Sequence, residues 1–268
     1  MQAVDVDAFW NDLAKVADDT YIPQSLADNK AHVSTIFTAL VYLFEKKVCH
    51  GDIKPPNVLW DAEKGYYKIA DLGSSKLITD IFKQMNRKFR FKSEAEKASL
   101  APVIRAFAAH NEAQVQKFSE SSPQKIERLV ELKVLNKKAV PDEKKLALIT
   151  DYIKSTFLPG TTKIYACQRY LDVMCDAFWQ CDEKLFEAAC NALDMRATAL
   201  TAYRIITSNP LPSEDGPGYD KLESALRAQN IGKEAANIIR RMAEPKSDEK
   251  FSLPVSIKEI KKLITLLR

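Results

Sequence analysis

The sequence predicts a mainly α-helical fold with one small β-hairpin. Apolar residues recur at helical spacing in several stretches, most clearly between residues 27 and 48. Two short runs of strand-forming residues, separated by a turn, occur between residues 58 and 70. The chain has only 7 glycines among 268 residues, which suits a mostly helical protein with few tight turns.

Composition limits the classes of protein that this sequence can belong to. Hydrophobic residues make up 46% of the chain, enough to bury the core of one sizeable domain or two small ones. No apolar run is long enough to span a bilayer and the N-terminus lacks the basic start of a signal peptide, so we expect a cytoplasmic protein with no membrane partner. The 5 cysteines lack zinc-type spacing and are odd in number, which indicates reduced core thiols. A net charge of +4, spread evenly, does not predict nucleic-acid binding.

Two helices are expected in the first part of the chain. Residues 5–18 predict a short amphipathic helix, and its apolar side consists of Phe9, Trp10, Leu13 and Val16. After a break at residues 21–23, residues 27–48 predict a longer helix with one buried stripe. That stripe consists of Val33, Ile36, Phe37, Leu40, Val41 and Phe44.

A dense group of polar residues follows this second helix. The segment reads Cys49-His-Gly-Asp-Ile-Lys-Pro-Pro-Asn57, and a second acid comes later, in Asp71-Leu-Gly73. Residues 58–60 and 66–70 predict two short strands joined by a turn, which would hold Asn57 and Asp71 on one rigid edge. The alternative is a surface loop that contains these residues by chance. So many matching residues in order, with a hairpin-length spacer between them, argue against that alternative.

This order of residues resembles the catalytic loop and the metal-binding loop of the protein kinase family. The family pattern is His-Arg-Asp, a Lys two residues later, an Asn, and then Asp-Phe-Gly. Here Gly51 replaces the Arg and Leu72 replaces the Phe. The resemblance implies the helical C-lobe of a protein Ser/Thr kinase that transfers the γ-phosphate of ATP to a protein hydroxyl with the help of Mg²⁺.

The resemblance also implies a role for each residue of the motif. Asp52 would accept or orient the proton of the attacking hydroxyl, and Lys54 would neutralise the phosphate of the nucleotide during transfer. Asn57 and Asp71 would provide hard oxygen ligands for Mg²⁺ bridging the nucleotide phosphates. His50, with its ring behind the loop, would be structural, as would Gly73.

Residues 86–157 are expected to be a helical insertion in the activation segment. Helices are predicted at residues 92–119, at residues 124–135 and from Pro141 onward. The apolar content of this region is too high for a disordered loop. Its first residues, 86–92, are basic and are interpreted as a solvated linker. The insertion is a candidate surface for binding a partner.

Residues 158–268 are expected to complete the C-lobe, with residues 1–85 as its first part. Residues 158–168 are similar to the end of an activation segment, except that Cys167 and Gln168 replace the Pro and Glu of the family triplet Ala-Pro-Glu. A helix at residues 193–207 would be the central helix of the lobe, with Asp194 bonding the backbone of the catalytic loop. Asp176 is the alternative for that role. Terminal helices are predicted at residues 219–229, 231–244 and 255–267.

Other functions stay open at the level of sequence. The family's N-lobe, with its Gly-rich loop, has no counterpart here, so the chain is either a fragment or naturally lacks that lobe, and activity of this chain alone is not predicted. The missing lobe, the large insertion and the altered Ala-Pro-Glu triplet also fit a pseudokinase that acts as an interaction scaffold. A small-molecule kinase of the aminoglycoside or choline type is disfavoured by Lys54 and Gly73. A translocated effector is compatible with the sequence, which identifies neither the substrate nor the oligomeric state.

Overall fold

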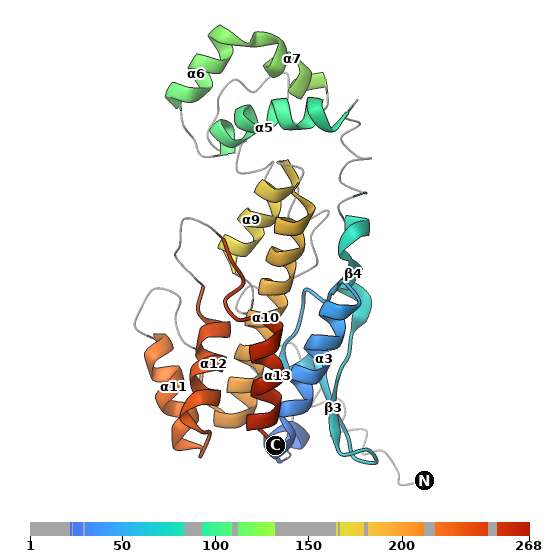
Figure 1. The fold of residues 1–268 in the computed structure, drawn as a ribbon, viewed down its shortest axis with the longest axis vertical. Coiled ribbons are helices and arrows are strands. Elements are labelled where there is room, and N and C mark those ends of the chain that lie inside the picture. Colours follow the sequence, from blue (N-terminus) through green and yellow to red (C-terminus); the bar gives the residue numbers. More distant parts are fainter. Residues whose placement is uncertain are drawn as a thin grey trace, which may run out of the picture. The chain divides into compact units, whose positions relative to one another are not determined.

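The computed structural model describes residues 22, 24–28, 30–81, 83, 93–108, 112–131, 165, 167–179, 182–211, 218–245 and 251–268. Within these residues the fold is mainly α with two short strand pairs, which confirms the predicted class (Figure 1). The chain divides into two compact units, one of residues 1–75, 160–167 and 191–268, the other of residues 76–159 and 168–190.

Several predicted features lie outside the described residues. They are the helix at residues 5–18, the basic stretch 86–92, the helix from Pro141 onward, and most of residues 158–168.

The first unit opens with a helix that is interrupted where the sequence predicted a continuous one. Gln24–Asp28 (α2) is followed by a single 3₁₀ turn, Lys30–His32 (η1), and then by Ser34–Glu45 (α3). The prediction of one helix over residues 27–48 was therefore wrong at both ends. The predicted stripe is confirmed, because all six of its side chains are buried.

A β-hairpin packs against these helices where the sequence predicted one. Val58–Asp61 (β2) pairs antiparallel with Tyr66–Ile69 (β3), with Val58 opposite Ile69. Gly65 closes the turn with φ of +66° and donates its N–H to the Asp61 carbonyl at 2.8 Å, which explains a glycine at this position. The helix α3 contacts β3, and α2 contacts β2.

Four helices are described in the C-terminal part of the chain, among residues 182–211, 218–245 and 251–268. They are Glu183–Thr207 (α10), Gly218–Ala228 (α11), Lys233–Ala243 (α12) and Ile257–Leu266 (α13). The last three confirm the predicted terminal helices within a few residues. The prediction that α10 begins at residue 193 was wrong, because Asp182 caps an earlier start by accepting from the Leu185 N–H at 2.9 Å.

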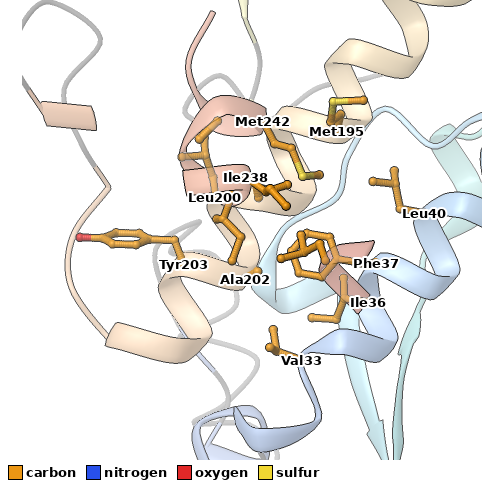
Figure 2. Close-up of a cluster of buried hydrophobic side chains, with 14 of the residues drawn as sticks. Val33, Ile36, Phe37, Leu40, Met195, Leu200, Ala202, Tyr203, Ile238 and Met242 are labelled. Atoms are coloured by element: carbon orange, nitrogen blue, oxygen red, sulfur yellow. The ribbon is translucent and has the colours of Figure 1, made fainter. Parts of the chain in front are cut away.

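The core of the first unit lies between α3, α10 and α12. Figure 2 shows Ile36 and Phe37 of α3 among side chains of α10 and α12, including Leu200 and Ile238. The helix α13 packs beside α3 and α12 (Figure 1). Burial of this apolar surface stabilises the packing of α3, α10 and α12. The polar segment that follows α3 therefore starts from a firmly packed helix.

The second unit is helical and contains most of the predicted insertion. After the two-residue strand Lys76–Leu77 (β4), its described helices are Glu94–Ala108 (α5), Glu112–Ser121 (α6), Pro123–Glu131 (α7) and Gln168–Trp179 (α9). The helix α5 contacts the other three and buries Leu100 and Val103. Lys97 is also buried, with its ammonium 3.5 Å from the centroid of the Phe178 ring. No helix that the structure describes is both long and apolar enough to cross a membrane.

Candidate active site

The polar segment after α3 begins with the strand Val48–Cys49 (β1) and ends in a 3₁₀ turn, Pro55–Asn57 (η2). The turn follows from the sequence. Lys54 precedes a proline, so its backbone is extended, and Pro55 supplies the fixed φ at the start of η2. Asn57 closes the turn by donating its N–H to the Lys54 carbonyl at 2.9 Å. Lys54 and Asn57 are thereby held within one turn of each other.

Asp52 lies at the centre of this segment. Its Oδ2 is 3.3 Å from the Lys54 ammonium and accepts a hydrogen bond from Asn57 Nδ2 at 3.1 Å. The same Nδ2 donates to the Asp52 carbonyl at 2.8 Å. The side chains of Asp52 and Lys54 keep 16% and 17% of their surface exposed, so both can reach a bound molecule. Lys54 and Asn57 therefore both contact the Asp52 carboxylate.

Asn57 has a second role that sequence reasoning missed. It was predicted to bind the metal and the cofactor, and its amide nitrogen also bonds both the carbonyl and the carboxylate of Asp52. No sequence signal could have revealed this contact, because residues five apart in an irregular segment have no fixed relative position.

The His50 ring links the Asp52 segment to the residue before Asp71. The ring is fully buried, and its Nε2 lies 3.0 Å from the Ala70 carbonyl. Its Nδ1 accepts the Asp52 N–H at 3.3 Å, so the proton of the neutral ring is on Nε2 and points to Ala70. The Ala70 N–H in turn donates to the Asn57 carbonyl at 2.8 Å. Ala70 is thus held on both sides by the polar segment.

Asp71 follows Ala70 in an unusual backbone conformation. Its φ is +57°, in the left-handed region that few residues other than glycine adopt but that Asp tolerates. The side chain is exposed, and Oδ1 accepts the Gly73 N–H at 3.3 Å. A Cβ at Gly73 would lie 3.2 Å from that oxygen, so a larger residue there would require the Asp71 carboxylate to shift by a few tenths of an ångström. A strained conformation at an exposed acid suggests a functional constraint.

Asp194, on α10, holds the beginning of the polar segment. Its Oδ2 accepts the His50 N–H at 2.7 Å and its Oδ1 accepts the Gly51 N–H at 2.8 Å. Burial raises the pKa of Asp194 to about 6, although the backbone bonds from Gly51 and His50 oppose this shift. Asp176, the alternative by sequence, is half-buried on α9 in the other unit.

The donor set of the site suits a hard cation held jointly with a ligand. No group of three or more His, Cys, Asp or Glu side chains within the described residues could hold a metal unaided. One amide oxygen from Asn57 and one carboxylate from Asp71 are the oxygen ligands that Mg²⁺ accepts when phosphates and waters complete its shell. Both residues adjoin the ends of the same hairpin, since Asn57 precedes β2 and Asp71 follows β3 by one residue.

Comparisons with known proteins identify the same part of the chain. Residues 9–92 match the protein kinase domain family. Glycogen synthase kinase 1 of Pyricularia oryzae is 39% identical over 51 residues, which are 19% of this chain and 13% of that protein. Protein kinase gsk31 of Schizosaccharomyces pombe is 45% identical over 49 residues, 18% of this chain and 13% of that protein.

A third relative, also a protein kinase by name, matches a shorter stretch of this chain at higher identity. The probable serine/threonine-protein kinase MRK1 homolog of Encephalitozoon cuniculi is 54% identical over 43 residues, 16% of this chain and 13% of that protein. The chain therefore matches only 13% of the length of each of these relatives. No solved structure matches the chain significantly.

Proposed function

Because this chain belongs to the protein kinase superfamily, we propose that it contributes the catalytic residues for transfer of the γ-phosphate of ATP to a Ser or Thr hydroxyl of a protein. The observation that carries the proposal is the contact between Asp52, Lys54 and Asn57. An acid, a cation and an amide are held together on a segment that Asp194 fixes to the core. Phosphoryl transfer depends mainly on such positioning and on charge stabilisation.

Asp52 and Lys54 have complementary roles in this proposal. The oxygen of the acceptor hydroxyl forms a bond to the γ-phosphorus, the bond to the ADP oxygen breaks, and the hydroxyl proton passes to Asp52. Lys54, 3.3 Å from the Asp52 carboxylate, is close enough to stabilise negative charge on the phosphate during transfer. Asn57 keeps the Asp52 carboxylate from rotating, because it bonds that residue at two oxygens.

ATP and Mg²⁺ are the cofactors of this proposal. Asn57 and Asp71 would hold Mg²⁺, and Lys54 would contact the nucleotide. When bound, the cation neutralises charge on the nucleotide phosphates. This chain's own contribution is to fix the two ligands, since the Ala70 N–H joins the Asn57 carbonyl directly before Asp71.

The same proposal includes the type of substrate residue, the surface that binds the partner and the cellular compartment. The Ser/Thr preference rests on the similarity to the probable serine/threonine-protein kinase of Encephalitozoon cuniculi. The region at residues 86–157, whose described helices are α5, α6 and α7, is the proposed surface for a partner or substrate. The proposed place of action is the cytoplasm, where ATP is abundant.

The test is transfer of radiolabelled phosphate from ATP to myelin basic protein by the full chain. Asp52→Asn and Asp71→Asn should each reduce transfer at least 100-fold, on the order expected for removal of a group that acts in the transition state. Asp80→Asn, which removes an exposed acid outside the site, should leave transfer unchanged. Equal transfer by all four proteins would refute the proposal.

A parallel binding measurement separates an enzyme from a scaffold. Mg·ATP should raise the melting temperature of the wild-type chain but not that of Asp71→Asn, because a ligand stabilises the folded state that binds it. Absence of any nucleotide-dependent shift in the wild-type chain would favour the scaffold.

A further inference from the structure

We propose that Thr35 and Tyr67 form a clasp that positions Asp71 relative to Asn57 by holding the hairpin β2–β3 in register. The importance of register follows from chain order. Asn57 directly precedes β2, and Asp71 follows β3 after Ala70, so the pairing of the two strands determines how far apart the two side chains lie. A slip of two residues would move Asp71 along β2 by about 7 Å, and a slip of one would turn β3 over.

A two-stranded hairpin does not hold its register well without help. Isolated hairpins are marginally stable in water, so the surrounding chain has to stabilise the pairing. On the edge of β3 that faces away from β2, the Tyr67 N–H donates to Thr35 Oγ1 at 2.9 Å. The same hydroxyl donates to the His32 carbonyl at 2.8 Å. Thr35 therefore joins the edge of β3 to the start of α3.

The Tyr67 side chain provides the second half of the clasp. Its hydroxyl donates to the Leu26 carbonyl at 2.8 Å, and only 2% of the residue is exposed. The Trp60 ring, opposite Tyr67 on β2, lies 5.2 Å away, and the His32 ring lies 5.0 Å beyond Trp60. One residue of β3 is thus anchored by its backbone to α3, by its hydroxyl to α2 and by its ring to β2.

Lys68 could not replace Tyr67 after a slip of one residue. It keeps 48% of its side chain exposed and pairs with Asp61 on the opposite face. A shift that brought Lys68 into the place of Tyr67 would bury this lysine against α2 and α3, at a large desolvation cost. The clasp therefore opposes a slip in that direction, and the two bonds at Ala70 transmit the register to Asp71. Its consequence for nucleotide binding rests on the function proposed above.

The experiment compares Thr35→Val with Thr35→Ser in the full chain. Valine has the shape of threonine but no hydroxyl, whereas serine keeps the hydroxyl. Amide hydrogen exchange at Tyr67 and Ala70 reports on the hairpin, and exchange at Ile239, buried in α12, reports on the whole fold. We expect Val to accelerate exchange several-fold at Tyr67 and Ala70 but not at Ile239, and Ser to match the wild type.

Two further measurements test the effect of the clasp on nucleotide binding and the contribution of the Tyr67 hydroxyl. Thr35→Val should weaken Mg·ATP binding several-fold, and Tyr67→Phe, which removes only the bond to Leu26, should change exchange at Ala70 in the same direction. The clasp is refuted if Val accelerates exchange at Tyr67 while Ala70 keeps the wild-type rate, because Asp71 would then be positioned by His50 and Asn57 alone. If the wild-type chain binds no Mg·ATP, the proposed function fails, while the exchange at Ala70 still decides the clasp.

Discussion

Replacement of Asp194 by alanine should destabilise the protein, and the size of the effect should depend on pH. The carboxylate accepts the backbone N–H groups of His50 and Gly51 in a fully buried position. Each buried donor that loses its partner costs about 1–3 kcal/mol, so the two together cost about 2–6 kcal/mol. The polar segment that carries Asp52 would lose its anchor to α10.

A second effect opposes this cost at neutral pH. Burial raises the pKa of Asp194 from 3.8 to about 6, a difference that corresponds to about 3 kcal/mol. When folding raises the pKa of a group, the group contributes its full stabilisation at pH values below its pKa in the unfolded state. That contribution is lost as the pH rises through its pKa in the folded state. Above pH 6 the wild type therefore bears the cost of a buried charge, and alanine removes it. The loss of stability for Asp194→Ala should therefore be smaller at pH 7.5 than near pH 4, by up to about 3 kcal/mol.

Urea denaturation of the wild type and of Asp194→Ala at pH 7.5 and pH 4.5 measures both values. Asp80→Ala is the control, because it removes an exposed acid and should stay within about 0.5 kcal/mol of the wild type. Asp194→Asn removes the titrating group and can accept only one of the two N–H groups, so its stability should change less between pH 4.5 and pH 7.5 than that of the wild type. An alanine variant that is less destabilised at pH 4.5 than at pH 7.5 would show that Asp194 is not buried as a charged acceptor.

Three other changes test separate parts of the molecule. Asp71→Asn keeps a residue that tolerates positive φ, so the melting temperature should stay close to that of the wild type while Mg·ATP binding is lost in calorimetry. Glu259→Gln should lower stability by less than about 1 kcal/mol at neutral pH. The Arg241 guanidinium and the Ser256 N–H lower the pKa of Glu259 from 4.5 to about 2, so this difference, measured by urea denaturation, should vanish as the pH falls from 4.5 towards 2. Limited proteolysis followed by mass spectrometry should find the first cuts in residues 86–92 or 136–142, where charge is dense, and rapid cleavage throughout α5–α7 would contradict a packed helical region.

The features that the sequence predicted well are those set by local periodicity. The stripe from Val33 to Phe44 repeats at helical spacing, and all of its members are buried. The hairpin at residues 58–69 was predicted from strand-forming residues on either side of a turn, and both strands formed. In each case neighbouring residues alone determine the pattern.

The wrong predictions concern the ends of helices. The sequence predicted that the central helix begins at residue 193, yet α10 begins at Glu183. A helix of this length can have an exposed, capped first turn and still be buried further along, as Asp194 and Thr198 are. The interruption between α2 and α3 was also missed, because the apolar stripe continues beyond it. The polarity of a segment indicates how exposed that segment is, and exposure changes along a single helix.

Most of the contacts that assemble the site use backbone atoms. The family resemblance predicted that Asp194 bonds the backbone of the catalytic loop, but nothing in the sequence indicated that Ala70 joins Asn57 through a peptide N–H. Every residue has these atoms, so no residue type marks them. The His50 side chain joins the segment of Asp52 to Ala70. This contact is recognised only in the structure, where the Ala70 carbonyl lies 3.0 Å from His50 Nε2. A change at Ala70 that moves its backbone should therefore impair the site as surely as a change at Asp71, although alanine carries no chemistry of its own.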